Sequence, residues 1–276
     1  MEFTKYTGLG NDFIFLDGTT ALSVQDPFTL AKRLCNRRLG IGADGLVLLL
    51  PSRKADVRMR IINSDGTEAE MCGNASRCVP LHLLLKEPSK KTKISLETLA
   101  GIIQTEVIDF DKGLIRVNMG FPRLTRKEIP MAGNAQDTVI GVVAEVSGRQ
   151  WVGTAVSMGN PHFVIFVEDI SQVDVARWGA QLEEHPLFPR KTNVEFVQIL
   201  DEKNVRMRVW ERGAGITQAC GTGACATAVA CVLNHKTKNR LTVHLDGGDL
   251  KIEWPDQKEI WMTGPASRVF TGDITL

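Results

Sequence analysis

Two cysteine–glycine pairs are the residues of this sequence best suited to acid–base chemistry. Cys72-Gly73 and Cys220-Gly221 each precede a run of small and apolar residues, 75–85 and 224–233, that predicts a buried helix. A cysteine at a helix start lies near unpaired backbone N–H groups and the positive end of the helix dipole, which favour a thiolate. Because the ordinary thiol pKa of about 8.5 is readily adjusted by surroundings, each cysteine could give or take a proton.

The other four cysteines are predicted to serve packing. Cys35, Cys78, Cys225 and Cys231 lie in apolar or helical contexts, where an inert buried thiol is the usual case. No Cys-x-x-Cys spacing is present, so we expect no metal site, and the sequence lacks the layout of a signal peptide, so we expect no disulfide framework.

The chain repeats itself. The tetrapeptide at 57–60, Val-Arg-Met-Arg, recurs at 205–208, and the interval of 148 residues equals the interval from Cys72 to Cys220. With a one-residue slip, the segment at 10–15 also aligns with the segment that begins at Gly159. The sequence therefore predicts two duplicated domains.

Each half carries many short strand signals and few helices. Alternating apolar and polar residues predict strands at 57–61 and 205–209, each followed by a loop, the Cys-Gly pair and one helix. Further strands are predicted at 13–17, 46–50, 94–97, 102–108, 114–117, 152–157, 163–167, 194–199, 241–245, 250–254 and 260–262. We predict an α/β fold of the α+β type, with two pseudo-symmetric domains, each a mainly antiparallel sheet wrapped around a central helix. The expected domains are 1–119, possibly completed by 268–276, and 120–267.

One cysteine per domain suits the inversion of a stereocentre. A proton must leave one face of the α-carbon while another arrives on the opposite face, so two groups must flank that carbon. We expect the substrate in a cleft between the domains, with its carboxylate at the two helix starts, where N–H groups stabilise the charge that develops. Such a mechanism needs no cofactor.

Composition points to a small-molecule partner. The hydrophobic fraction of 43% is enough for a globular core. The net charge is only +1, so no overall electrostatic field draws the chain to nucleic acid or to an anionic membrane. Apolar runs such as 46–50 are far shorter than the roughly 20 residues of a membrane span. We expect a cytoplasmic protein.

Six short motifs, in order along nearly the whole chain, resemble diaminopimelate epimerases. They are Gly8-Leu9-Gly10-Asn11-Asp12-Phe13, Asn63-Ser64-Asp65-Gly66, Met71-Cys72-Gly73-Asn74, Gly159-Asn160-Pro161-His162, Glu211-Arg212-Gly213 and Ala219-Cys220-Gly221-Thr222-Gly223. The resemblance implies an enzyme, usually a homodimer, that interconverts LL- and meso-diaminopimelate for lysine and cell-wall synthesis without pyridoxal phosphate.

The same resemblance implies a role for individual residues. Cys72 and Cys220 would exchange protons with the α-carbon, and the backbone of Gly73, Asn74, Gly221 and Thr222 would bind the reacting carboxylate. Glu211 would meet the reacting ammonium group, and with His162 it would tune the cysteine pKa values. Asn63, Asn160, Asn193 and Arg212 would read the distal end of the substrate, with Asn11 completing the pocket.

Three alternatives stay open at this point. A proline or hydroxyproline racemase also uses two cysteines, but it typically has histidine after the first Cys-Gly, where this chain has Asn74. A related racemase could act on another amino acid such as histidine. A catalytically silent amino-acid-binding protein is the third alternative, and loss of a thiol would be its signature, whereas both thiols are present.

Overall fold

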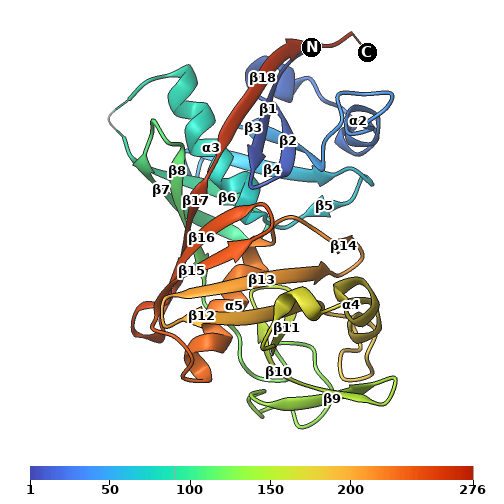
Figure 1. Cartoon of the computed structure of the whole chain (residues 1–276). Coiled ribbons are helices and arrows are strands. Elements are labelled where there is room, and N and C mark those ends of the chain that lie inside the picture. The colour runs from blue at the N-terminus through green and yellow to red at the C-terminus, as the bar shows by residue number, and fades with distance from the viewer. Residues whose placement is uncertain (90, 276) are drawn as a thin grey trace. The chain divides into compact units, whose positions relative to one another are not determined.

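The computed structural model describes residues 1–89 and 91–275, which form two compact units (Figure 1). Unit 1 comprises Met1–Asn118 and Thr263–Leu276, and unit 2 comprises Met119–Met262. The unit boundaries therefore fall at 118/119 and 262/263, against expected boundaries at 119/120 and 267/268. Leu276, the last residue of the predicted C-terminal segment, lies outside the described residues.

Unit 1 is a mixed sheet in which the C-terminal strand pairs with the first. β1 (Glu2–Gly8) lies antiparallel to both β18 (Ser267–Asp273) and β2 (Asn11–Leu16), as Figure 1 shows. The other strands are β3 (Gly45–Leu50), β4 (Val57–Asn63), β5 (Glu68–Ala69), β6 (Lys93–Thr98), β7 (Gly101–Asp109) and β8 (Leu114–Gly120).

Unit 2 repeats this arrangement strand by strand. Its strands are β9 (Val142–Val146), β10 (Arg149–Ser157), β11 (Pro161–Phe166), β12 (Asn193–Asp201), β13 (Asn204–Glu211), β14 (Gly215–Ile216), β15 (Arg240–Leu245), β16 (Gly248–Glu253) and β17 (Ile260–Pro265). β2–β3 and β4–β6 pair in parallel, as do their counterparts β11–β12 and β13–β15, and the matched neighbours pair antiparallel. The predicted duplication and mainly antiparallel sheets are confirmed.

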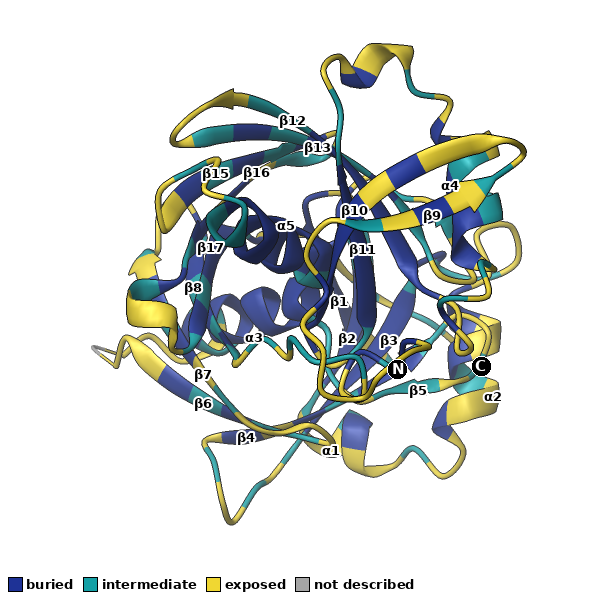
Figure 2. Ribbon diagram, turned by 90° about the horizontal axis from the view of Figure 1, so that it is seen from below, coloured by how far each residue is buried: buried dark blue, intermediate teal, exposed yellow. Residues whose placement is uncertain are grey.

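One long helix per unit carries the Cys-Gly pair at its start. α3 (Gly73–Lys86) follows Cys72 and α5 (Gly221–Leu233) follows Cys220, and each cysteine is the N-cap residue in extended backbone geometry. Both helices lack a polar face, and most of their residues are buried, as the dark ribbon in Figure 2 shows. The predicted buried helices are therefore confirmed. Because each helix is enclosed by its own sheet, its first residue is fixed by packing rather than by helix propensity.

The structure also contains short helices that the sequence analysis missed. They are α1 (Gly18–Leu22), α2 (Pro27–Leu34), α4 (Val175–Glu183) and two single turns, η1 (Ile170–Gln172) and η2 (Pro255–Gln257). Two of them carried a readable start signal, since the Asp26 side chain caps α2 ahead of Pro27 and the Asp174 side chain caps α4.

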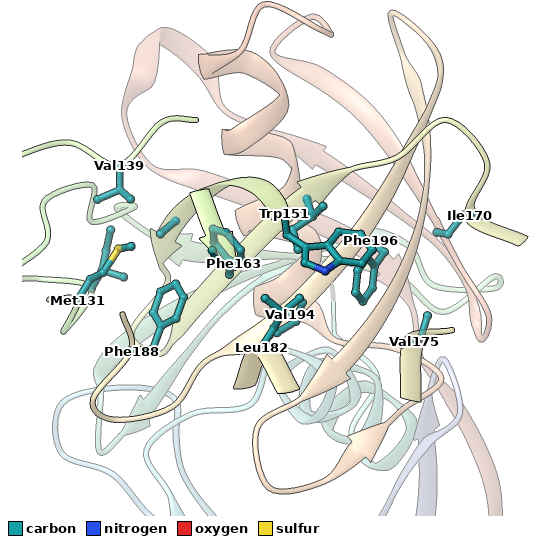
Figure 3. Packing of buried hydrophobic residues seen from close by; sticks show 14 residues of the cluster. Met131, Val139, Trp151, Phe163, Ile170, Val175, Leu182, Phe188, Val194 and Phe196 are labelled. Carbon is teal, nitrogen blue, oxygen red and sulfur yellow. The ribbon is translucent and has the colours of Figure 1, made fainter. Parts of the chain in front are cut away.

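Aromatic packing forms much of the core of unit 2. Trp151 on β10 packs edge-to-face against Phe196 on β12, and Phe163 on β11 packs against Phe188, with Leu182 of α4 in the same cluster (Figure 3). These side chains fix α4 on the β11–β12 pair, the strands that carry several of the predicted site residues.

Within residues 1–89 and 91–275, no helix is long and apolar enough to cross a membrane.

A buried histidine ties α3 to the end of β2. His82 Nε2 lies 2.8 Å from the Asp17 carboxylate and Nδ1 lies 3.1 Å from the Tyr6 hydroxyl. The hydrogen bond from His82, helped by Lys86, lowers the Asp17 pKa from 3.8 to about 2. A carboxyl group with a lowered folded-state pKa stabilises the fold above its unfolded value and loses this contribution as pH falls.

We predict that Asp17→Asn lowers the free energy of unfolding by about 1 kcal/mol at pH 7, a figure reduced for the partial exposure of the carboxylate. The difference from the wild type should shrink as pH falls from about 4 toward 2. Urea denaturation of both proteins at pH 7, 4 and 3 tests this. A difference that is the same at all three values would contradict the assigned ion pair.

Candidate functional site

Each unit places its N-cap cysteine beside predicted site residues from neighbouring strands. In unit 1 the Cys72 thiol lies 3.8 Å from Asn11 Oδ1, and Asn74 Nδ2 donates a hydrogen bond of 3.2 Å to the same oxygen. Asn11 opens β2, whereas Cys72 and Asn74 belong to the start of α3. Two side chains from the start of α3 thus contact the amide oxygen of Asn11 at the start of β2.

An ionic cluster holds Asn11 in this orientation. Asn11 Nδ2 donates to Asp44 Oδ2 at 2.6 Å, so its Oδ1 is turned toward the thiol. Arg37 bridges Asp44 and Asp12 at 2.8 and 2.7 Å, and Lys5 pairs with Asp12 at 2.8 Å. Burial acts to raise the Asp12 pKa, but the hydrogen bonds from Arg37 and Lys5 outweigh it and lower this pKa to about 2, so the Asp12 carboxylate is ionised at neutral pH.

Asn63 and Gly73 are two further predicted site residues of unit 1. Asn63 ends β4, where its Nδ2 donates to Thr67 Oγ1 at 3.0 Å, and the next residue, Ser64, donates its N–H to the Asp44 carbonyl. The Gly73 carbonyl accepts a 3.4 Å hydrogen bond from Arg77 Nη1, from a side chain that is fully buried. This buried guanidinium adds positive charge to the start of α3.

Unit 2 surrounds its cysteine with hydrogen bonds and acidic side chains. The Gly223 N–H donates to Cys220 Sγ at 3.3 Å, and the Thr222 hydroxyl lies 3.5 Å from the same sulfur. The Glu211 side chain, at the end of β13, hydrogen-bonds to the thiol and also accepts from the Thr217 hydroxyl. Cys220, Thr222 and Glu211 are therefore brought together.

Burial and charge make this thiol a weak acid. Burial raises the Cys220 pKa well above its usual range, and the carboxylates of Glu211 and Glu195 raise it further. The hydrogen bonds from Thr222 and Gly223 act in the opposite direction but are smaller. Burial likewise raises the Glu211 pKa. The helix start alone, on which the expectation of a thiolate rested, is outweighed here, and the protonated thiol is favoured.

Histidine and asparagine complete this group. His162 is fully buried on β11, and its Nε2 lies 3.0 Å from Asn160 Oδ1, while Asn160 Nδ2 donates to Thr222 Oγ1 at 3.3 Å. Its Nδ1 lies 2.6 Å from the carboxylate of Glu195. His162 is therefore linked to Cys220 through Asn160 and Thr222.

A turn after β13 exposes the predicted arginine. Asn193 Nδ2 donates to the Pro161 carbonyl at 2.7 Å, and Asn193 Oδ1 accepts from the Arg212 N–H at 2.9 Å. The Arg212 side chain is exposed and donates from Nη1 to the Arg190 carbonyl at 3.1 Å. Asn193 thus fixes the backbone from which the guanidinium projects, while that group keeps donors for a carboxylate.

Three residues in these contacts were missed by the sequence analysis. Asp44 orients Asn11, Thr217 binds Glu211, and Glu195 binds His162. Only Glu195 left a signal in the sequence, because it is a charged residue within the otherwise apolar strand segment Val194–Val197.

The sequence of this chain is similar to one family of known proteins over nearly its whole length. The family model described as Diaminopimelate epimerase matches residues 3–125 and 154–269. A diaminopimelate epimerase of Desulforudis audaxviator is 54% identical over 274 residues, covering 99% of this chain and 98% of the relative. A diaminopimelate epimerase of Moorella thermoacetica is 51% identical over 280 residues, covering the whole of both chains.

Solved structures of lower identity share the fold. A phenazine biosynthesis protein of the PhzF family from Bacillus anthracis superposes with a TM-score of 0.71 at 17% identity, covering 100% of this chain and 99% of that one. A hydroxyproline epimerase from Agrobacterium vitis gives 0.68 at 14% identity, covering 99% and 91%. At these identities the likeness concerns the fold alone.

The electrostatics of unit 2 can be tested by alkylation. Glu211→Gln removes a negative charge beside Cys220, so the thiol pKa should fall and iodoacetamide should modify Cys220 about three- to tenfold faster at pH 8. Peptide mass spectrometry reads the rate at each cysteine, and the fully buried Cys225 serves as the internal control. An unchanged or slower rate at Cys220 would contradict the assigned charge effect.

Proposed function

Because the chain belongs to the diaminopimelate epimerase family, we propose that it interconverts LL- and meso-diaminopimelate by moving a proton at one α-carbon, without a cofactor. The observation that carries the proposal is the repeated placement of a cysteine at the start of a buried helix, Cys72 in unit 1 and Cys220 in unit 2. The supporting identity extends over nearly the whole chain.

The proposed reaction uses the two thiols on opposite faces of the α-carbon. One cysteine, as thiolate, takes the α-proton, and the C–H electron pair passes onto the carboxylate as an enolate-like charge. The other cysteine, as thiol, delivers its proton to the opposite face, which inverts the centre. Each turnover leaves the protonation of the pair reversed, so the enzyme then serves the reverse direction or exchanges protons with water.

Backbone N–H groups at the two helix starts would stabilise the intermediate. Gly73 and Asn74 in unit 1 and Gly221 and Thr222 in unit 2 supply these groups, and a helix start favours a bound carboxylate. The Glu211 carboxylate would accept a hydrogen bond from the ammonium group at the reacting carbon. That positive charge would also offset the effect of the Glu211 carboxylate on the Cys220 pKa, so binding of substrate would ease formation of the Cys220 thiolate.

The remaining predicted residues would read the second amino-acid end of the substrate. The exposed Arg212 guanidinium suits the distal carboxylate, and Asn63, Asn160 and Asn193 offer amides to the distal carboxylate and ammonium groups, with Asn11 at the edge of the pocket. Proline and hydroxyproline have no such distal end and would offer the Arg212 guanidinium no second carboxylate, which favours diaminopimelate over these substrates.

We extend the proposal to the setting of the enzyme. An epimerase acting on diaminopimelate would serve lysine and peptidoglycan precursor synthesis in the cytoplasm. We also propose a homodimer, by analogy with the family.

The proposal predicts that reduced protein converts LL-diaminopimelate into the meso form, and that Cys72→Ser and Cys220→Ser each lower kcat at least about a thousandfold, because a serine hydroxyl is a far weaker acid than a thiol. Chiral chromatography of the product measures the rate. The control is Cys231→Ala, which changes a buried cysteine on α5 about three helical turns after Cys220 and should keep activity.

Three outcomes would contradict parts of this account. Near-normal turnover by either serine variant would remove the two-thiol mechanism. Conversion of L-proline or L-histidine in place of diaminopimelate would keep the mechanism and replace the substrate. Binding of diaminopimelate without conversion of any of these amino acids would favour an amino-acid-binding protein.

A further inference from the structure

Glu195 is a buried carboxylate to which the proposed reaction assigns no task. Its side chain on β12 is fully buried, and Oε1 lies 2.6 Å from His162 Nδ1. Within residues 1–89 and 91–275, the second oxygen, Oε2, has no hydrogen-bond partner. Burying a charge with a single partner costs stability and is a weak way to hold a fold together. The pair therefore calls for a functional reason.

The duplicated unit shows that the fold does not need this pair. The 148-residue shift that relates the units carries Val47 of β3 onto Glu195, and the one-residue slip carries Phe13 of β2 onto His162. Both residues of unit 1 are apolar and buried, and their strands pair in parallel as β11 and β12 do. An apolar pair thus fills the same place in the same topology.

A continuous chain of hydrogen bonds runs from Glu195 to the thiol of Cys220. It passes from Glu195 to His162 at 2.6 Å, to Asn160 Oδ1 at 3.0 Å, from Asn160 Nδ2 to Thr222 Oγ1 at 3.3 Å, and to Cys220 Sγ at 3.5 Å. Both nitrogens of His162 face oxygen acceptors, an arrangement that a doubly protonated ring satisfies in full. Because Asn160 donates to the Thr222 oxygen, the hydroxyl hydrogen of Thr222 can point to the sulfur.

We propose that Glu195 is a positioning residue for the Cys220 half of the proposed active site, on which this inference rests. Its charge holds His162 as an imidazolium, which fixes the Asn160 amide and directs the Thr222 hydroxyl as a donor to Cys220. A neutral His162 would need a hydrogen from Asn160 at Nε2. The amide would then turn, and the Thr222 hydroxyl would donate to Asn160 and no longer to the sulfur.

The start of α5 is built to lie against this carboxylate. A Cβ atom on Gly223 would come 2.7 Å from Glu195 Oε1 and 3.2 Å from Cys220 Sγ, so any larger residue would collide with the carboxylate. Glycine at this position lets the helix start, the thiol and the carboxylate occupy one small volume. Glu211 is the other carboxylate whose charge acts on Cys220 there.

Unit 2 contains a matched control at its surface. His244 Nδ1 lies 2.7 Å from Asp249 Oδ1 and its Nε2 lies 3.2 Å from Asn204 Oδ1, so a carboxylate, an imidazole and an amide follow in the same order. Asp249 is 60% exposed, and these residues belong to β13, β15 and β16, outside the hydrogen-bond chain to Cys220. Asp249→Asn therefore removes an equivalent carboxylate without touching the proposed site.

The first experiment is 15N NMR of the histidine rings at neutral pH in the full chain, with the His162 signal assigned through His162→Gln. The wild type should show His162 with both nitrogens protonated, and Glu195→Gln should convert it to a neutral tautomer, whereas Asp249→Asn should leave it unchanged. A neutral His162 ring in the wild type, or an imidazolium that persists in Glu195→Gln, would overturn the proposal.

Turnover then separates positioning from packing. Glu195→Gln keeps the size of the side chain and removes its charge, while Glu195→Asp keeps the charge and shortens the side chain. The proposal predicts kcat about ten- to a hundredfold lower in Glu195→Gln, partial recovery in Glu195→Asp, and a wild-type rate in Asp249→Asn. The reverse order of the two Glu195 variants would indicate packing and contradict the proposal. An inactive wild type would refute the proposed function instead, while the NMR result would still decide the state of His162.

Discussion

The structure depends on one constraint, a cysteine held at the N-cap of a helix that its own sheet encloses. In an enclosed helix the first turn cannot fray or slide, so the thiols of Cys72 and Cys220 are fixed relative to the strands around them. The strand ends that carry Asn11 in unit 1 and Glu211 in unit 2 can then meet the sulfur from the side. Packing of the helix is therefore what makes a precise thiol environment possible.

The two units share a topology but give their cysteines different surroundings. Unit 1 sets an amide oxygen of Asn11 beside Cys72 and braces it with the cluster around Asp44. Unit 2 buries Cys220, which raises the Cys220 pKa, and the nearby carboxylates of Glu211 and Glu195 raise it further. The changes fall at matched positions, since the 148-residue shift places Asn63 on Glu211. The same topology therefore gives Cys72 and Cys220 different neighbouring side chains.

The sequence was sufficient for the features that have a local pattern. Alternating residues located the central strands, the repeat gave the duplication, and small apolar residues after each Cys-Gly gave the buried helices. Features that depend on tertiary contacts were out of reach. The link from Asp44 to Asn11 joins residues 33 positions apart, and the rise in the Cys220 pKa comes from burial and from charges on other strands, which no spacing rule encodes.

The central claim, that two thiols act on one α-carbon, is tested most directly by following deuterium during epimerisation of LL-diaminopimelate in D2O. If separate groups remove and deliver the proton, the first meso product should carry deuterium at the inverted carbon, while the unreacted LL substrate recovered at the same time should carry almost none. Return of the original proton to the product, or equal early labelling of substrate and product, would indicate a single base and would contradict the account.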